Sequence, residues 1–393
     1  MAETLKLESL CEKIVDCEHK TAPAAPPGQE YGYAVGTPHI RAGRILLGNA
    51  KPVDRATYEL WTAREAPQAG DLILAREAPV GEVGRILPGQ RICLGQRTVL
   101  LRPNADRADP TYLHYLLLSP QVQDEMLSKA SGSTVSHLNV KDIRLLPVPT
   151  LPTLEDQRQI GGLLEALDDK IAVNDRIAST ADTLRSSLLQ DAQEQRRDDF
   201  LAQPLSQVAE FINGRAFTKG ATGNGRMVVR IAEINSGPGP STVYNDIAVD
   251  EKHLAHPGDI LFSWSGSLAV TRWFRPEAII NQHIFKVIPR GHNPKWLAFE
   301  AVKSKLADYR AIAADKATTM GHIQRRHLDE EVVVPIPEVI DRLDRQAGNL
   351  WQRALVAEQE SLTLAALRDS LLPELMSGRL RVRDAEKVIE EAV

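Results

Sequence analysis

Apolar residues recur at three- and four-residue steps from about Leu154 to Gln195, at positions Ile160, Leu163, Leu167, Ile171, Asn174, Ile177, Ala181, Leu184 and Leu188. A second stretch, from about Ile340 to Leu372, repeats this spacing before Pro373 and Ser377-Gly378. The period predicts two long amphipathic helices. Stripes this long and narrow favour an antiparallel coiled coil over two unrelated surface helices. Asn174, the polar residue on the first stripe, either fixes its register or lies at a solvated edge.

The two remaining stretches have short apolar runs separated by Gly and Pro, which predicts irregular, strand-rich α+β domains. Each contains one clear short helix. Asp109-Pro110 and Asn293-Pro294 place a capping side chain before a proline at the first helical position.

The chain repeats itself once, with an offset near 185, and self-similarity of this kind indicates duplication. Six blocks recur in the same order, and they pair as follows: Gly70–Leu74 with Gly258–Phe262, Gly95–Arg97 with Asn281–His283, Asp109–Leu113 with Asn293–Leu297, Ser133–Leu138 with Thr318–Ile323, Pro147–Pro149 with Pro335–Pro337, and Leu184–Leu189 with Leu367–Leu372. We therefore expect two similar domains (1–150 and 200–337), each followed by a helical segment (151–199 and 338–393), related by a pseudo-twofold internal repeat.

The net charge of −5 does not suggest a nucleic-acid-binding protein, but the distribution of the charge is compatible with one. Residues 151–199 carry 6 basic and 11 acidic side chains, and residues 338–393 carry 8 and 11. Residues 1–150 carry 17 of each, and residues 200–337 carry 16 basic and 13 acidic. The acid is thus concentrated in the predicted helices, and local patches rather than the total determine DNA binding.

Composition indicates a globular cytoplasmic protein. No window has the ~18 consecutive apolar residues of a membrane span, and the charged N-terminus is unlike a signal peptide. Three cysteines (Cys11, Cys17 and Cys93) suggest a reducing compartment without a disulfide framework.

Two patterns suggest chemistry, and each has a simpler explanation. Asp109-Pro110-Thr111-Tyr112 is similar to the Asp/Asn-Pro-Pro-aromatic motif of amino-methylating DNA methyltransferases, as is its copy at 293–296. The second proline and a Gly-rich cofactor turn are missing, so helix capping is favoured. Cys11, Cys17 and His19 are too widely spaced for a usual zinc site and lack a fourth ligand. We expect no catalytic, cofactor-binding or metal-binding residues in this chain.

Three loop regions recur in both halves and combine Lys and Arg with hydroxyl, amide and imidazole groups, which suit phosphates and base edges. Ordinary polar loops are the alternative. The candidate DNA-binding residues are His19, Lys20, Thr21, Arg41, Arg44, Ser133, Thr134, His137 and Asn139 in the first half, and Arg215, Lys219, Arg230, Asn235, Thr318, Thr319, His322, Gln324 and Arg325 in the second.

The chain resembles the specificity subunits of Type I restriction-modification systems over nearly its whole length. The most specific segments are Leu151–Ile160, continuing to Leu167–Ile171, and Leu367–Leu380. The first resembles the family's Pro-x-Leu-x-Glu-Gln segment, with Glu155-Asp156-Gln157 in place of adjacent Glu and Gln. The second resembles its Leu-Arg-Asp-x-Leu-Leu-Pro-x-Leu-x-Ser-Gly ending, and Phe211–Phe217 resembles an opening of its recognition domain.

The resemblance implies two target-recognition domains held apart by two long helices, which read a bipartite asymmetric duplex DNA target. Two modification subunits would bind the chain and methylate adenine N6 with S-adenosylmethionine. Two restriction subunits, where present, would use ATP and Mg²⁺. This chain would be non-catalytic. An adenine methyltransferase with a degenerate motif and a coiled-coil protein adaptor are the alternatives.

Overall fold

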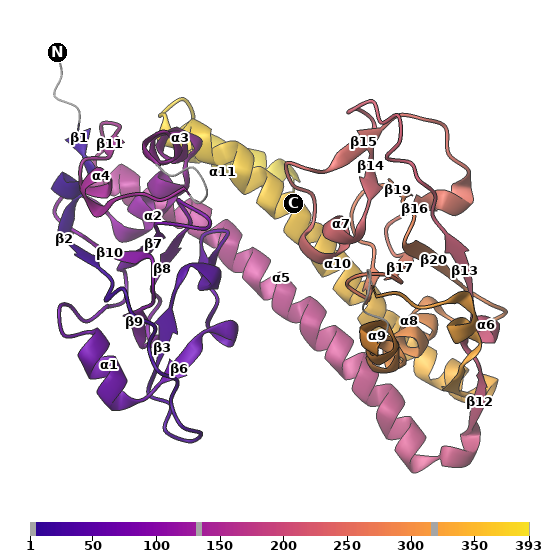
Figure 1. Cartoon of the computed structure of the whole chain (residues 1–393). Helices are drawn as coiled ribbons and strands as arrows, with labels where there is room; N and C mark the ends of the chain where they lie inside the picture. The colour runs from indigo at the N-terminus through magenta and orange to yellow at the C-terminus, as the bar shows by residue number, and fades with distance from the viewer. Residues whose placement is uncertain (1–4, 131–135, 316–320, 393) are drawn as a thin grey trace. The chain divides into compact units, whose positions relative to one another are not determined.

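A computed structural model describes residues 5–130, 136–315 and 321–392 (Figure 1). The longest helices are α5 (Leu154–Gln195, 42 residues) and α10 (Pro337–Met376, 40 residues), and α11 (Val382–Ala392) follows. Contacts divide the chain into two compact units. Unit 1 comprises residues 1–169 and 364–393, and unit 2 comprises residues 170–363. Each unit therefore contains one α+β domain with a portion of each long helix.

Unit 1 is built on a four-stranded sheet in the order β2-β10-β7-β8 and a three-stranded sheet in the order β6-β3-β9. Its strands are β1 (Leu5–Lys6), β2 (Cys11–Asp16), β3 (Gly32–Val35), β4 (Ile40–Arg41), β5 (Arg44–Ile45), β6 (Lys51–Val53), β7 (Leu72–Ala75), β8 (Val83–Arg85), β9 (Ile92–Leu94), β10 (Thr98–Pro103) and β11 (Pro147–Val148). Its short helices are α1 (Arg55–Trp61), α2 (Pro110–Leu118), α3 (Pro120–Lys129) and α4 (Val140–Arg144).

Unit 2 repeats this topology with sheets in the order β13-β20-β17-β18 and β15-β14-β19-β16. Its strands are β12 (Phe200–Pro204), β13 (Ala209–Asn213), β14 (Arg226–Val229), β15 (Val243–Asn245), β16 (Leu254–Ala255), β17 (Ile260–Ser263), β18 (Ala269–Arg272), β19 (Ala278–Ile280), β20 (Ile284–Pro289) and β21 (Glu331–Pro335). Its short helices are α6 (Leu205–Val208), α7 (Ile231–Ser236), α8 (Lys295–Ser304) and α9 (Leu306–Asp315). In both units one pair is parallel, β3 with β9 and β14 with β19, which confirms the internal repeat.

Within unit 2, α5 and α10 run antiparallel, because Asn174 contacts Glu360 while Arg185 lies over Trp351. Small residues at their contact, Ala178, Ala181, Ala354 and Ala357, are buried together and permit a close approach. Asn174 is fully buried and its amide donates to the Glu360 carboxylate at 3.0 Å, so it is not a solvated edge residue. The predicted antiparallel helical pair is confirmed.

In unit 1, α5 packs on the first turn of α2. Asp109 caps α2 by accepting from the amides of Thr111 and Tyr112, as predicted. The buried Gln157 of α5 holds this cap, because its Oε1 accepts from the Asp109 amide at 2.9 Å. Gln157 belongs to the Glu-Asp-Gln segment that carries the family resemblance.

One predicted helix cap was wrong. In unit 2, α8 begins at Lys295 with Pro294 as its N-cap, and Asn293 lies one residue too early to cap. Its amide instead donates to the Val208 carbonyl at 3.1 Å. Helix α10 includes Pro373 and ends at Met376, directly before Ser377-Gly378, where the sequence predicted its end. Among the described residues, no helix is long and apolar enough to span a bilayer.

Candidate nucleic-acid interface

In unit 1, the ends of three adjacent strands of the larger sheet lie side by side. β10 is antiparallel to β2 and to β7, so its first residue lies beside the last residues of both. Arg76 follows β7 and Arg97 precedes β10, and the Arg76 amide donates to the Arg97 carbonyl at 2.8 Å. The Leu138 amide donates to the Arg76 carbonyl at 2.9 Å, so the loop before α4 also lies beside these strand ends. We call this region the unit 1 edge.

The unit 1 edge is polar and partly cationic. Asp16 accepts from His19 at 3.0 Å and pairs with Arg76 at 3.6 Å. Arg97 pairs with Glu77 at 3.0 Å, but 53% of its side chain remains exposed. A guanidinium group that is held on one side and exposed on the other can bind a phosphate or a guanine edge.

The unit 2 edge has the same backbone arrangement with different side chains. The Trp264 amide donates to the His283 carbonyl at 3.1 Å, and the Ile323 amide donates to the Trp264 carbonyl at 3.1 Å. Trp264 therefore occupies the position of Arg76, and His283 that of Arg97. The Trp264 indole donates to Asn213 at 2.9 Å, and its ring centroid lies 5.1 Å from that of His283.

Arg97 and His283 share an uncommon backbone conformation. Their φ angles are 67° and 77°, in the left-handed region that residues other than glycine seldom adopt. Such conformations cost roughly 1–3 kcal/mol and are concentrated at functional sites. Both edges thus keep the same unfavourable conformation at the same position of the repeat.

The unit 2 edge also contains buried polar atoms that have no hydrogen-bond partner among the described residues. They are Ser265 Oγ, Asn281 Oδ1, Gln282 Oε1 and His283 Nδ1. Leaving such a group unsatisfied costs roughly 1–3 kcal/mol. Donors and acceptors gathered in this way at one edge suit a ligand with a polar periphery, such as the edge of a base pair.

The edges bring together the first and third predicted loops. In unit 1, His137 pairs with Glu77 in a β-bridge, and His19 lies in the loop that follows β2. In unit 2, backbone β-bridges join Arg215 to Asn281 and His322 to Ser265. Other predicted residues in these loops are exposed, namely Lys20, Thr21, Asn139, Lys219, Gln324 and Arg325, and Asn139 donates to Asp142 at 3.1 Å. Ser133, Thr134, Thr318 and Thr319 lie outside the described residues.

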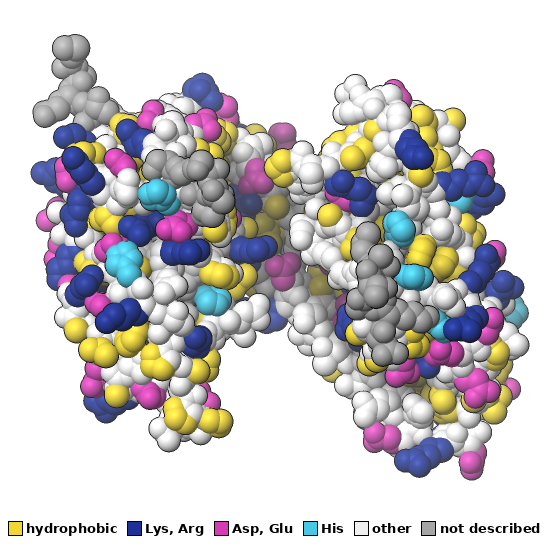
Figure 2. Space-filling model, viewed as in Figure 1, with side chains coloured by type: hydrophobic (Ala, Val, Ile, Leu, Met, Phe, Trp, Pro, Cys, Tyr) yellow, Lys and Arg dark blue, Asp and Glu magenta, His cyan; other side chains and the backbone are white. Residues whose placement is uncertain are grey.

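The second predicted loop is arranged differently. Arg44 donates to the Asp168 carbonyl of α5 at 2.6 Å, and Arg230 pairs with Glu233 at 2.6 Å. Both guanidinium groups therefore have partners within the chain, and their contact with DNA stays a prediction. Arg41 and Asn235 are exposed. Figure 2 shows Lys, Arg and His side chains on the visible face of each unit.

Sequence reasoning missed four residues of the edges, namely Arg76, Arg97, Trp264 and His283. A signal was present for two of them, because Gly95-Gln96-Arg97 and Asn281-Gln282-His283 are one of the repeated blocks.

The methyltransferase-like segments have structural roles. Asp109 is engaged as a helix cap, and Tyr112 is buried. Trp296, which is also buried, donates to Asp344 of α10 at 2.7 Å. Neither aromatic ring is available to stack on a base.

The possible metal ligands of unit 1 form a hydrogen-bonded network. Asp16, Cys17 and His19 offer ligand atoms within 4.8 Å of one another, whereas Cys11 is not part of this group. His19 faces Asp16 through Nε2 and Cys17 through Nδ1, which are different ring nitrogens. The Arg76 guanidinium also competes for Asp16. This arrangement suits a charge network better than a cation site.

Comparison with known proteins finds similarity to one group of proteins. Residues 3–180 match the model of the Type I restriction modification DNA specificity domain. Over these residues the chain is similar to the DNA specificity domain of Type I restriction-modification systems. The Escherichia coli type I restriction enzyme EcoBI specificity subunit is 24% identical over 205 residues, which are 49% of this chain and 42% of that protein. A provisionally named specificity subunit from Methanocaldococcus jannaschii is 28% identical over 152 residues, which are 38% of this chain and 33% of that protein.

The matches thus span less than half the length of these relatives. Among solved structures, the Type I restriction-modification S subunit from M. genitalium is similar, with a TM-score of 0.54 and 15% identity over 95% of each chain. This likeness shows that the whole chain shares the specificity-subunit fold.

Proposed function

We propose that this chain is the DNA-reading subunit of a Type I restriction-modification complex. Residues 1–150 and 200–337 would be its target-recognition domains, and the segments 151–199 and 338–393 would supply the long helices. The single observation that carries the proposal is the duplicated edge, in which Arg97 and His283 share one backbone conformation but differ in side chain. A duplicated scaffold with unlike reading groups would recognise two unlike words in duplex DNA.

The chemistry would belong to partner subunits. Two modification subunits would use S-adenosylmethionine to methylate adenine N6, and two restriction subunits, where present, would use ATP and Mg²⁺. This chain would work in the cytoplasm without a cofactor of its own. The capping role of Asp109 supports a non-catalytic chain, and the family match opposes a purely structural adaptor.

The long helices are the proposed docking surface for the modification subunits. In unit 2 they border a groove of about 330 Å³ that is lined by Val173, Ile177, Leu184 and Leu350 together with polar neighbours. Val173 and Leu184 are 45% and 50% exposed, so the groove presents uncovered apolar surface. We propose that an apolar helix of the modification subunit covers this groove.

The direct test is reconstitution with the modification subunit of the host. We expect the complex to methylate plasmid DNA at one bipartite sequence and the isolated chain to transfer no methyl groups. Methyl transfer by the purified chain that is lost on Asp109→Ala would favour the methyltransferase alternative. A stable complex with no DNA affinity would favour the adaptor.

A further inference from the structure

The repeated block Leu-Arg-x-Ser-Leu-Leu places an arginine, Arg185 or Arg368, on each long helix. Arg185 is fully buried in unit 2. Its Nε and Nη2 donate to one carboxylate oxygen of Glu300, on α8, at 3.1 and 2.9 Å. The guanidinium also lies over the rings of Phe299 and Trp351 at 5.1 and 5.2 Å. Arg185 therefore joins α5 to α8 and α10.

A second buried arginine completes this network. Arg272, at the end of β18, is 3% exposed. It donates to Glu358 of α10 at 2.8 and 3.0 Å and to Asp182 of α5 at 3.1 and 3.2 Å. Asp182 also accepts from Arg185. The network thus ties the sheet and the α8 helix of the unit 2 domain to both long helices.

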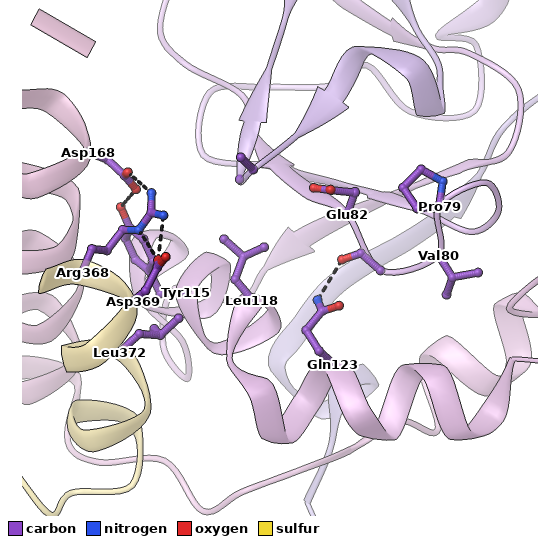
Figure 3. A pocket seen from close by; sticks show the side chains of 13 residues that line it. Pro79, Val80, Glu82, Tyr115, Leu118, Gln123, Asp168, Arg368, Asp369 and Leu372 are labelled. Atoms are coloured by element: carbon purple, nitrogen blue, oxygen red, sulfur yellow. Dashed lines mark hydrogen bonds and ion pairs between the residues drawn. The ribbon is translucent and has the colours of Figure 1, made fainter. Parts of the chain in front are cut away.

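Unit 1 contains the corresponding network (Figure 3). Arg368 of α10 donates to the Asp168 carboxylate of α5 at 2.5 Å, and the Tyr115 hydroxyl of α2 donates to its other oxygen at 2.6 Å. Arg85, which ends β8 as Arg272 ends β18, pairs with Glu165 of α5. Beside this network is a cavity of about 340 Å³ whose lining includes Tyr115, Asp168 and Arg368.

Buried ion pairs of this kind add little net stability, because desolvation offsets the attraction. Their geometry is nevertheless demanding, since a planar guanidinium group accepts few orientations relative to its carboxylate partners. Such a contact is better suited to fixing an angle between elements than to holding them together.

In each unit the network lies at one end of a pair of strands, and the edge of that unit lies at the other end. In unit 2, Arg272 lies opposite Ile260 at the start of β17, and Trp264 follows the end of that strand. In unit 1, Arg85 lies opposite Leu72 at the start of β7, and Arg76 follows its end. Four residues of strand correspond to about 13 Å, so a small tilt at the network would displace the edge by about an ångström.

We propose that Arg185 and Arg368 are positioning residues for DNA reading, each for one word of the target. Arg185 fixes the angle at which the unit 2 domain presents its edge, and Arg368 does the same for unit 1. Neither arginine touches DNA. This inference rests on the proposed function.

The test uses the full chain bound to its modification subunit and plasmid libraries in which one word at a time carries single-base changes. Arg185→Gln is expected to lower discrimination against mismatches in the word read by unit 2 by about tenfold and to leave the other word unchanged. Arg368→Gln should have the reciprocal effect. Arg290→Gln, at an exposed position that follows β20 at the end away from the unit 2 edge, is the control for loss of one charge and should change neither word.

Arg185→Gln leaves Glu300 without its buried partner and could unfold the domain. The double variant Arg185→Met, Glu300→Leu removes both charges and keeps an apolar contact, and such replacements are often tolerated. It should retain assembly and thermal stability and still lose discrimination at one word. Equal loss at both words, or full discrimination in the folded double variant, would overturn the inference. If the wild-type complex shows no bipartite specificity, the proposed function itself fails.

Discussion

Gly161 of α5 lies against the first turn of α2, and a Cβ atom at this position would come within 2.9 Å of the Tyr112 backbone nitrogen. The adjacent Gly162 faces open space. Two neighbouring glycines of one helix therefore differ in the space around them. Only at Gly161 does the packing require a residue without a side chain.

Substituting these glycines should shift stability in opposite directions. Gly161→Ala is expected to lower the free energy of unfolding by about 1–3 kcal/mol, because α5 must move away from α2. Gly162→Ala should raise it by up to about 1 kcal/mol, since alanine favours the helix. Urea unfolding of the full chain measures both, and equal effects would contradict the close approach.

Removing the indole of the unit 2 edge should weaken the recognition of one word. Trp264→Ala loses a half-buried ring and its hydrogen bond to Asn213, and we expect about a tenfold loss of affinity at that word. Trp264→Phe keeps an aromatic ring but loses the N–H donor, and it serves as the matched control that separates stacking from the hydrogen bond. Competition binding of the assembled complex to duplexes altered in one word measures the effect, and an equal loss for both words would argue against this role.

Arg97 is expected to contribute a phosphate or base contact. Arg97→Gln should reduce the slope of log affinity against log salt by about one, provided the contact is to a phosphate. A base contact would instead appear as relaxed specificity at one position. Arg290→Gln is again the control, and an unchanged slope together with unchanged specificity would remove Arg97 from the interface.

The buried His114 should make unit 1 sensitive to acid. Burial lowers the pKa of His114 to about 4, so the folded chain keeps the imidazole neutral while the unfolded chain protonates near 6.5. The unfolded state thus binds more protons between these values, and stability should fall as the pH drops through this window. The expected loss between pH 7.5 and 5 is roughly 2 kcal/mol.

Urea unfolding at the two pH values measures this loss. His114→Gln should be less stable at pH 7.5 but should lose the part of the pH dependence due to this group. A pH dependence identical to that of the wild type would contradict the assignment.

The architecture could be predicted from the sequence to the extent that it depends on periodicity and duplication. The apolar period defines α5 from Leu154 to Gln195, because a repeat sustained over 42 residues has few alternatives. Local rules were weaker at helix ends, where Asn293 satisfies all the requirements of a cap yet bonds to Val208.

The residues proposed to read DNA were only partly predictable, because the edges depend on tertiary pairing. Arg44 and Arg230 are residues of the type that contacts DNA. In the structure Arg44 donates to the distant Asp168 carbonyl, and Arg230 pairs with the nearby Glu233 carboxylate. Arg97 and His283 share a left-handed backbone conformation, which the repeated block that contains them does not reveal.

The most direct test of the central claim is the map of methylated adenines in DNA from cells that express this chain with its modification subunit. We predict one motif of two unlike words separated by unspecified bases, and replacement of residues 1–150 by those of a relative should change one word and preserve the other. A continuous palindromic motif, or a motif that stays the same after this replacement, would contradict the claim that two duplicated edges each read one word.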